Sequence, residues 1–355
     1  GGGRNTQRIS RLAKAAMFGD RDEEPHVIQG RLTDCWHIFT NQSKLSAFIT
    51  SIIGFYSPPM FRARQKGTDM DKTWLITGAS SGFGRGLVEK LLARGDRVIA
   101  TVRRTGSLDD LVAQYGERLR VAYLDVSDTD AVQATVDKAF ADVGRIDFIV
   151  SNAAFGILGA AEETGIDQMR HIIDTNLLGS IVVIKAALPH LRAQGSGRII
   201  QVSSEGGQIA YPGFSLYHAT KWGIEGFVES LAKEVAPFDI EFMIVEPGPA
   251  RTPFIGSIVQ PDPIAAYDGT PAHDLKEAAF GGGWVIKGDP ARMVDAMIAA
   301  SDAPHMPFRL LLGSDAYAGV RAALTERLAV LEAGKDVTLA ADFTEEELAA
   351  MQATV

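Results

Sequence analysis

Tyr217 and Lys221 are the residues of this 355-residue chain whose types and spacing could most directly perform acid–base chemistry. Side chains four residues apart lie on one face of a helix, so the phenol and the ammonium would be neighbours. A free tyrosine titrates near ~10, so work near neutral pH would require its pKa to fall by roughly three units, or about 4 kcal/mol. A lysine one turn away can supply part of that stabilisation. Because the same spacing also occurs by chance on exposed helix faces, the pair needs support from the rest of the chain.

A glycine-rich segment, TGASSGFG at 77–84, follows a short apolar run and opens a helical pattern. Gly78 and Gly82 would let the backbone turn tightly and approach a pyrophosphate, while Gly84 would allow close helix–sheet packing. The helix N-terminus would add amide donors and a favourable dipole. The Gly-x-x-x-Gly-x-Gly spacing differs from the common Gly-x-Gly-x-x-Gly fingerprint, and such loops can be plain turns. The strand–loop–helix context favours a dinucleotide site.

Polar residues at the ends of the next three predicted strands point to the same ligand. Arg103 follows the second strand, where an acidic residue would select the ribose hydroxyl of NAD and an arginine suits the 2′-phosphate of NADP. Asp125, after the third strand, could accept a hydrogen bond from an adenine amine, and Asn152 closes the fourth. Arg103 favours NADP, although a solvated loop arginine would leave the choice between NADP and NAD open. Asp125 and Asn152 could equally be turn or cap residues.

Regular alternation of strands and helices after Met70 predicts the fold. Short β-branched and aliphatic runs predict buried parallel strands, and amphipathic segments between them predict covering helices, such as 86–94 before Gly95. The predicted strands span 74–76, 97–102, 121–124, 148–150, 198–202, 242–245 and 310–312. With right-handed crossovers they give an α/β fold, a doubly wound, Rossmann-type parallel sheet of about seven strands in three α/β/α layers.

The chain divides into two unlike parts. Residues 1–69 are predicted to be an N-terminal extension, either poorly ordered or translated upstream of a start at Met70, with a targeting or interface role as the alternative. Residues 70–345 are predicted to form a single NAD(P)-binding domain with C-terminal helices. Within it, prolines and glycines punctuate 253–288, and a loop of that length is usually functional or disordered. We expect this segment to cover the substrate as a lid.

Composition argues against several classes of partner. A hydrophobic content of 46% with 22% charged residues is ordinary for a globular protein. The net charge of −9 argues against nucleic acid or an anionic membrane surface as the main partner. The apolar run at 45–56 is shorter than the ~20 residues of a spanning helix, so we expect no membrane span. The single cysteine, Cys35, fits a reducing cytoplasm. We expect no metal site.

Taken together, these motifs resemble the short-chain dehydrogenase/reductase family in its single-domain form, from Met70 to about Leu312. The matching pieces are TGASSGFG, Asp125-Val126, SNAAFG at 151–156, NLLG at 176–179, Ser204, YHATK at 217–221 and PGPART at 247–252. The family's usual Asn-Asn-Ala-Gly is replaced here by Ser-Asn-Ala-Ala at 151–154. From this departure we expect a weaker local fit and not lost cofactor binding.

The resemblance implies a catalytic tetrad. Tyr217 would donate or accept the proton, and Lys221 would lower the pKa of Tyr217 and hold the nicotinamide ribose. Ser204 would position and polarise the substrate oxygen, and Asn176 would hold a water in the proton relay. Gly248 and Thr252 would border the nicotinamide. The implied cofactor-binding residues are Gly78, Ser80, Ser81, Gly82, Phe83, Gly84, Arg103, Asp125, Val126, Asn152, Ala153, Tyr217, Lys221, Pro247, Gly248 and Thr252.

The resemblance further implies an oxidoreductase that uses NADP, or NAD, to interconvert a secondary alcohol and a ketone or aldehyde. Apolar residues in and near the expected lid favour a small apolar or aromatic substrate, unless they form only the lid's own core. These residues are Phe155, Ile209, Tyr211, Phe214, Phe254, Ile255, Ile258, Phe280 and Trp284. A non-catalytic NADP-sensing regulator would commonly lose Tyr217 or Lys221. A same-fold epimerase or dehydratase should show a nucleotide-sugar pocket. The family also implies a homodimer or homotetramer, and we expect a cytoplasmic location.

Overall fold

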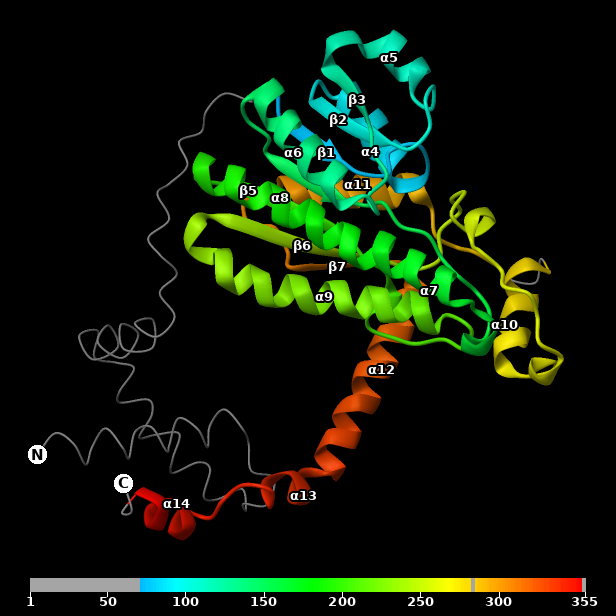
Figure 1. Cartoon of the computed structure of the whole chain (residues 1–355), viewed down its shortest axis with the longest axis vertical. Coiled ribbons are helices and arrows are strands. Elements are labelled where there is room, and N and C mark those ends of the chain that lie inside the picture. Colours follow the sequence, from blue (N-terminus) through cyan, green and yellow to red (C-terminus); the bar gives the residue numbers. More distant parts are fainter. Residues whose placement is uncertain (1–70, 282–284, 353–355) are drawn as a thin grey trace, which may run out of the picture. The chain divides into compact units, whose positions relative to one another are not determined.

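A seven-stranded, all-parallel sheet forms the centre of the fold (Figure 1). In the computed structural model, which describes residues 71–281 and 285–352, the strand order is β3-β2-β1-β4-β5-β6-β7. The strands are β1 (Thr73–Ile76), β2 (Arg97–Val102), β3 (Leu119–Tyr123), β4 (Phe148–Ser151), β5 (Gly197–Val202), β6 (Ile240–Pro247) and β7 (Arg309–Leu312). The predicted doubly wound sheet is confirmed. The predicted extension, 1–69, lies outside the described residues.

β3 and β6 differ most from their predicted bounds, whereas β1, β4, β5 and β7 each differ by one residue at one end. β3 begins at Leu119, where it pairs with Val98, and not at 121. β6 begins at Ile240 and runs to Pro247, because β5 pairs with its first six residues and β7 with its last four. Hydrophobic runs locate the buried centre of a strand, whereas pairing with neighbours decides where it ends.

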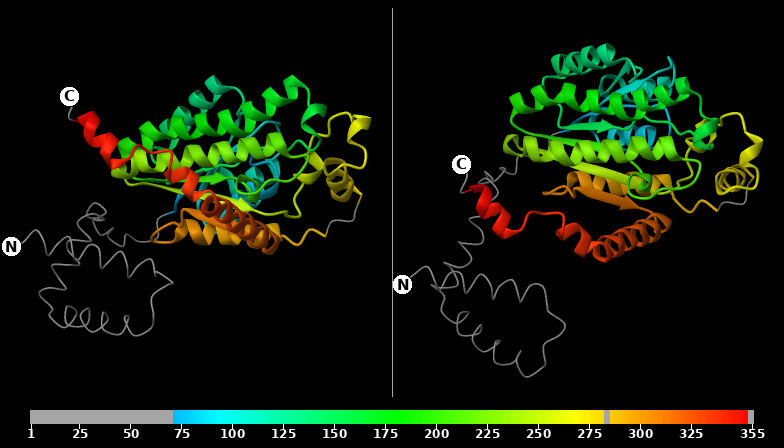
Figure 2. Two further views of the ribbon diagram at one scale, coloured as in Figure 1. Left: turned by 90° about the horizontal axis from the view of Figure 1, so that it is seen from below. Right: turned by 60° about the horizontal axis from the view of Figure 1, so that its bottom comes forward.

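Helices cover both faces of the sheet, which gives the three predicted layers (Figure 2). Leu87 and Leu91 of α4 and Met297 of α11 pack on one face, with Trp74 and Ile76 of β1. The opposite face, with Leu75, packs against α6, α8 and α9. The helices are α4 (Gly82–Ala93), α5 (Asp109–Tyr115), α6 (Thr129–Val143), α7 (Ile166–Ile173), α8 (Gly179–Gln194), α9 (Ser215–Val235), α10 (Pro271–Phe280), α11 (Pro290–Asp302), α12 (Ser314–Ala333), α13 (Lys335–Leu339) and α14 (Glu345–Gln352). Because β1 is buried on both faces, its side chains alternate between the two cores.

The point where the strand order reverses lies beside β1. β1 pairs with β2 on one side and with β4 on the other, so the loops after β1 and β4 diverge at the carboxyl ends of the strands. Ligands of open α/β sheets bind in the crevice that this divergence creates. The glycine-rich segment 77–84 and Asn152 both lie there, directly after β1 and β4.

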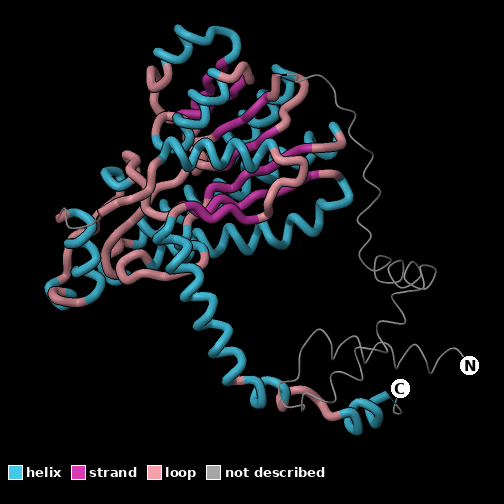
Figure 3. Tube along the Cα trace, turned by 180° about the vertical axis from the view of Figure 1, so that it is seen from behind, coloured by secondary structure: helices cyan, strands magenta, loops and turns pink. Residues whose placement is uncertain are grey.

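The segment 253–288 and the C-terminal helices follow β6. This segment contains two short 3₁₀ turns, Ile255–Ser257 and Ala265–Tyr267, and then the helix α10. Residues 282–284 lie outside the described residues. After β7, α12 extends away from the sheet, and α13 and α14 continue from it (Figure 3).

The stretch Ile166–Gln194 joins α7, a π-helical turn η3 (Asp174–Leu178) and α8. Within the described residues it alone is long and apolar enough, by length and composition, to cross a membrane. Half of its apolar window is buried inside the fold, where Val183, Ile184 and Leu191 pack in the core under α8. Packing against the sheet is therefore sufficient to account for its apolar character.

Candidate functional site

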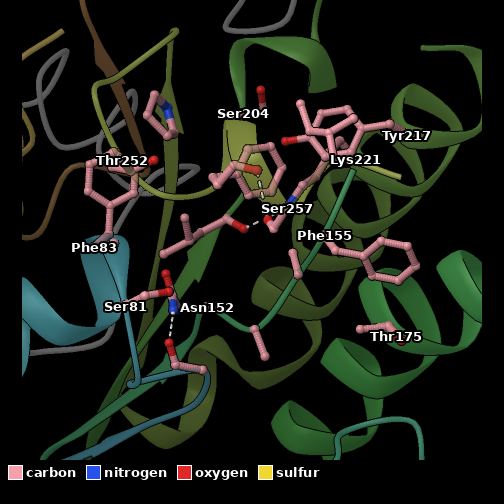
Figure 4. Close-up of a pocket in the computed structure, with 18 of the residues that line it drawn as sticks. Ser81, Phe83, Asn152, Phe155, Thr175, Ser204, Tyr217, Lys221, Thr252 and Ser257 are labelled. Atoms are coloured by element: carbon pink, nitrogen blue, oxygen red, sulfur yellow. Dashed lines mark hydrogen bonds between the residues drawn. The ribbon is translucent and has the colours of Figure 1, made fainter. Parts of the chain in front are cut away.

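A single pocket of about 510 Å³ lies at the carboxyl ends of the strands and brings most of the predicted site residues together. In Figure 4, Ser81 and Asn152 lie on one side of it, and Ser204, Tyr217 and Lys221 on another. Gly84 and Asn176 support the site from outside the lining. The predicted residues that line the pocket are Gly78, Ser80, Ser81, Gly82, Phe83, Arg103, Asp125, Val126, Asn152, Ala153, Ser204, Tyr217, Lys221, Pro247, Gly248 and Thr252.

The glycine-rich loop adopts a backbone that side chains would obstruct. Gly78 and Gly82 have φ of +66° and +55°, the left-handed region that favours glycine. A Cβ on Gly84 would overlap Gly78 O and would lie 2.7 Å from Asn152 Nδ2. The three glycines therefore let the loop turn, and let α4 begin directly beneath it, with the first amides of α4 at the pocket.

Substituting alanine for Gly84 should therefore disturb this loop. The new methyl would force the loop and α4 apart, so we expect at least a tenfold weaker NADPH affinity and a loss of about 1–3 kcal/mol of stability. Gly226→Ala is the matched control, because that helical glycine has no atom within 4 Å of the new methyl. The control should be as stable as wild type or more stable, by about 0.5–1 kcal/mol. Fluorescence titration with NADPH and urea unfolding would measure both effects, and equal affinities in the two variants would contradict the role given to Gly84.

Asn152 and Asp125 each make local hydrogen bonds at the pocket. Asn152 Nδ2 donates to Thr77 O at 2.9 Å and to Gly78 O at 3.1 Å, so its amide holds the glycine-rich loop. Asp125 Oδ1 accepts from the amide and the hydroxyl of Ser127, at 3.0 and 2.7 Å. The local turn role that the sequence left open is therefore present at both residues. Arg103 is largely exposed, and its Nη1 lies 3.9 Å from Asp125 Oδ2.

Tyr217 and Lys221 lie one turn apart on α9, as their spacing predicts. Lys221 is buried; its ammonium donates to Val202 O at 3.1 Å and lies 5.6 Å from the centroid of the Tyr217 ring. Tyr217 and Ser204 both line the pocket. The Ser204 hydroxyl also caps a 3₁₀ turn by accepting from the amide of Gly206 at 3.1 Å. The serine and tyrosine hydroxyls thus converge at one place in the pocket.

Burial changes the acidity of both α9 residues. It raises the pKa of Tyr217 to about 12, against a smaller opposing effect of the Ser204 side chain. It lowers the pKa of Lys221 to about 8. The lowering expected for Tyr217 is therefore wrong for the protein by itself, because the apolar surroundings penalise the phenolate and the ammonium is directed at Val202 O. At neutral pH Tyr217 carries its proton and can donate it.

A buried ionic network holds the serine loop against α9. Glu225, one turn after Lys221, accepts from the Ser203 hydroxyl at 2.6 Å, and Arg309 Nη1 lies 2.6 Å from its other oxygen. The same guanidinium binds Glu246 of β6 and Glu229. A Cβ on Gly207 would collide with the Glu225 carboxylate, so glycine is needed there for the close approach. Ser203 is thereby fixed, and with it the neighbouring Ser204.

Asn176 lies on the π-helical turn η3 and is fully buried. Its amide accepts from the backbone N–H of Phe155 at 3.0 Å and donates to the carbonyl of the same residue at 2.8 Å. A weaker bond at 3.3 Å reaches Thr220, between Tyr217 and Lys221. Asn176 therefore ties the loop after β4 to α9, and its role in a proton relay stays a prediction.

A profile of the short chain dehydrogenase family matches residues 72–262, which is more than half of the chain. The chain belongs to this family. It is 39% identical to oxidoreductase BOA17 of Botryotinia fuckeliana (strain B05.10) over 257 residues, which cover 70% of this chain and 92% of that protein. A solved short-chain dehydrogenase from Streptomyces avermitilis is 39% identical, with a TM-score of 0.72, and the match covers 77% of this chain and all of that one. An alcohol dehydrogenase from the archaeon Thermococcus sibiricus, solved with 5-hydroxy-NADP, is 26% identical, with a TM-score of 0.56, over 68% of this chain and 96% of that one.

The pocket of this short-chain dehydrogenase fits a nicotinamide dinucleotide. Gly78 lies so close to Ala153 that a Cβ would lie 2.8 Å from Ala153 Cα, so only glycine fits there. Without a side chain at this position, a pyrophosphate could approach the amides at the start of α4. Arg103 and Lys221 line the same pocket. Across 71–281 and 285–352, no group of three or more His, Cys, Asp or Glu side chains could hold a metal ion.

Part of the pocket lining is apolar, and several of these residues come from the segment 253–288. Of the apolar residues singled out from the sequence, those that line the pocket are Phe155, Tyr211, Phe214, Phe254, Ile255 and Ile258. Ile209 does not; it is buried instead, close to Gly319 of α12. Phe280 ends α10 with 38% of its surface exposed, so it too is outside the lining. Trp284 lies outside the described residues. Both corrections concern side-chain direction, which composition alone does not determine.

Several pocket residues were not found by sequence reasoning. Glu205 lines the pocket and is buried, as is Thr175. His171 also lines the pocket, with its ring 4.9 Å from that of Phe155. The position of Glu205 directly after Ser204, at the carboxyl end of β5, was a signal that could have identified it. His171 and Thr175 lie on the long helical stretch 166–194, where the pattern gave no sign of which side chains turn toward the site.

Proposed function

We propose that the protein is an NADP(H)-dependent oxidoreductase that interconverts a secondary alcohol and a ketone or aldehyde, with Tyr217 as proton donor or acceptor. The observation that carries the proposal is the convergence of Ser204 and Tyr217, with Lys221 buried one turn away, in the pocket that begins at the glycine-rich loop. A proton-transfer group and a dinucleotide cradle are then parts of one cavity.

The residues of the site divide the work of carbonyl reduction. When bound, the nicotinamide supplies the hydride. Tyr217, which is protonated at neutral pH, donates its proton to the substrate oxygen, and the Ser204 hydroxyl donates a hydrogen bond to the same oxygen. Both donors are held in place before negative charge develops there, so they stabilise the transition state more than the ground state. Glu225, through Ser203, keeps the serine loop in position.

For alcohol oxidation Tyr217 must act as a base, and burial opposes the phenolate. Positive charge nearby is the physical means of reversing that effect. Lys221 supplies one charge while it is protonated, which its pKa of about 8 allows at neutral pH. Reduction uses Tyr217 in its protonated form, which burial favours, whereas oxidation needs the phenolate. We therefore propose reduction as the favoured direction.

The preference for NADP rests on Arg103, which lines the pocket after β2 where no carboxylate is present to select NAD. Arg103→Ala should raise the KM for NADPH about tenfold, because one charged hydrogen bond to the 2′-phosphate is worth about 1.5–3 kcal/mol, and should leave the KM for NADH unchanged. Arg120→Ala is the control, since this arginine of β3 instead pairs with Asp142. Initial rates over a range of both cofactors would measure the effect. Wild-type oxidation of NADH in clear preference to NADPH would contradict the proposal.

The test of the function itself is a panel of ketones, aldehydes and alcohols with NADPH or NADP, followed at the nicotinamide absorbance band. We expect turnover of small apolar or aromatic ketones, because aromatic and aliphatic side chains line the substrate end. No turnover of any carbonyl compound or alcohol, with intact cofactor binding, would favour a regulatory, cofactor-sensing protein. Epimerisation or dehydration of a nucleotide-sugar would favour an epimerase or dehydratase of the same fold. Retention of Tyr217, Ser204 and Lys221 counts against the cofactor-sensing regulator but not against the epimerase or dehydratase.

A homodimer or homotetramer is also proposed. Its support is a stripe of exposed apolar residues along α12, at which a second copy of the chain would bury Leu324, Leu328 and Leu331. Light scattering should give two or four chains per particle, and a monomer at micromolar concentration would contradict this. A cytoplasmic location is kept as a proposal that rests on the single cysteine.

A further inference from the structure

Glu205 is a buried carboxylate at the centre of the site that the proposed mechanism does not use. It directly follows Ser204, begins the 3₁₀ turn Glu205–Gly207, and lines the same pocket with 5% of its surface exposed. Its Oε2 is fully buried and has no hydrogen-bond partner among the described residues. Buried carboxylates are normally paired or fully hydrogen-bonded, so an unpartnered oxygen here requires an explanation.

The surroundings of Glu205 do not neutralise it. Burial raises the pKa of its carboxyl to about 7, Asp315 adds to the effect, and no positive charge opposes it. A Cβ on Gly248, in the loop expected at the nicotinamide, would lie 3.5 Å from Oε2. The carboxylate therefore lies between that loop and the pocket wall and retains capacity to bind a further group.

Tyr211 supplies the second half of a polar pair. Its hydroxyl donates to Glu205 Oε1 over 3.4 Å, a long hydrogen bond, and the residue is 38% exposed. Burial raises the pKa of this phenol to about 12, so it remains protonated and able to donate. The His218 ring lies 5.8 Å from that of Tyr211 and accepts from its amide at 2.8 Å, so it is already engaged. Phe155, Phe214 and Phe254 add apolar surface to the same pocket. An acceptor and a donor thus stand together in a pocket with a substantial aromatic lining.

We propose that Glu205 and Tyr211 form a polar subsite that binds a second hydroxyl group of the substrate, so that the preferred substrates are hydroxyketones and the corresponding diols. A substrate hydroxyl can donate to the carboxylate and can accept the single phenol proton of Tyr211 in exchange for the long bond to Glu205 Oε1. An ammonium can only donate, and a carbonyl can only accept. This inference rests on the proposed function and specifies its substrate class.

The subsite should discriminate strongly between matched substrates. Leaving out the hydroxyl would return Glu205 to its unpartnered state, and sites built to hydrogen-bond a substrate hydroxyl reject analogues that lack it. We expect wild-type kcat/KM for the best hydroxyketone to exceed that for the parent ketone by about 10- to 100-fold. The ratio of these two values is the quantity to follow, because it cancels general damage to the enzyme.

The experiment uses a series of hydroxyketones in which the hydroxyl moves one carbon at a time away from the carbonyl, each with its parent ketone and its amino analogue. Glu205→Leu should bring the ratio of kcat/KM for the hydroxyketone to that for its parent ketone close to one. Tyr211→Phe should lower this ratio severalfold, and Glu205→Gln should retain part of the preference. Tyr267→Phe is the matched control, since Tyr267 makes a tyrosine–glutamate pair with Glu162 outside the pocket lining. If Glu205→Leu does not fold, Glu205→Gln and Tyr211→Phe decide the result.

The outcomes separate the subsite from the proposed function. The subsite would be disproved if the wild-type enzyme reduced parent ketones and hydroxyketones with similar kcat/KM, or if the preference for hydroxyketones persisted in Glu205→Leu. Either result would leave the proposed oxidoreductase function intact. Preference for the amino analogue would overturn the hydroxyl assignment. A lower melting temperature of Glu205→Leu with an unchanged ratio would show a purely structural carboxylate. If no carbonyl compound is turned over, calorimetric titration of NADP-loaded protein with a diol and its matched alcohol tests the subsite alone, and equal affinities overturn it.

Discussion

Tyr217→Phe should lower kcat for ketone reduction by about 10²- to 10⁴-fold, the usual contribution of a positioned general acid. The variant loses only the hydroxyl, which lies in the pocket with Ser204 and would protonate the substrate oxygen. The ring remains and still packs beside Phe214 and Phe254. We therefore expect little change in stability. Steady-state kinetics with NADPH, together with NADPH affinity from fluorescence, would measure the effect.

The split between chemistry and binding is the informative part of that measurement. NADPH affinity should remain within about threefold of wild type, because Lys221 and the glycine-rich loop are intact. Tyr317→Phe is a control for loss of a phenol elsewhere, since Tyr317 lies on α12 and is 64% exposed. Its kcat should equal that of wild type. Near-normal kcat in Tyr217→Phe would show that another group supplies the proton.

The acidity of Tyr217 shows where sequence reasoning stops. The spacing of Tyr217 and Lys221 correctly predicts that they share a helix face, because that depends only on helix geometry. The direction of the pKa shift depends on burial and on where the ammonium points, and both are tertiary properties. Lys221 donates to Val202 O, on a strand 19 residues earlier in the chain. No local pattern around Tyr217 contains that information.

The fold and the convergence of the motifs were accessible for a different reason. Parallel strands end at one edge of a sheet, so residues that follow β1, β4 and β5 must lie near one another once the strands are recognised. Gly78, Asn152 and Ser204 therefore line one pocket. What each side chain binds was not accessible in the same way. Asn152 donates to loop carbonyls and Asn176 holds the backbone of Phe155, whereas sequence reasoning placed both toward the cofactor or the proton relay.

The ionic network around Arg309 was missed altogether. Glu225, Glu246 and Arg309 come from α9, β6 and β7, and local sequence presents them as isolated charges at the margins of apolar runs. The register of β6 with β7 places Glu246 opposite Leu311, two residues from Arg309 along the strand. Arg309 follows Glu246 by 63 residues and Glu225 by 84 residues, so only the tertiary fold brings the three charges into contact. Strand register and helix rotation, and not composition, create this network.

Arg309→Met should be among the most destabilising substitutions at the site, with an expected loss of about 3 kcal/mol of unfolding free energy. Glu225 and Glu246 are buried, at 3% and 0% exposure, and each would lose its cationic partner. Removing one partner of a buried ion pair typically costs about 3–5 kcal/mol. The lower end is expected because the Arg309 side chain is 31% exposed and water screens part of the interaction.

The pH dependence of that loss distinguishes unpaired carboxylates from a mere packing defect. Burial already raises the pKa of Glu246, and removing Arg309 should raise it further. A carboxyl with a raised folded-state pKa costs stability above that pKa, and the cost disappears as the pH falls below the unfolded value, since both states are then protonated. Urea unfolding of Arg309→Met should therefore show a larger deficit at pH 8 than at pH 5. Arg292→Met, at an 88% exposed side chain paired with Asp289, should lose less than about 0.5 kcal/mol at either pH. A deficit that is equal at both pH values would assign the loss to packing, and no deficit would show that the carboxylates do not depend on Arg309.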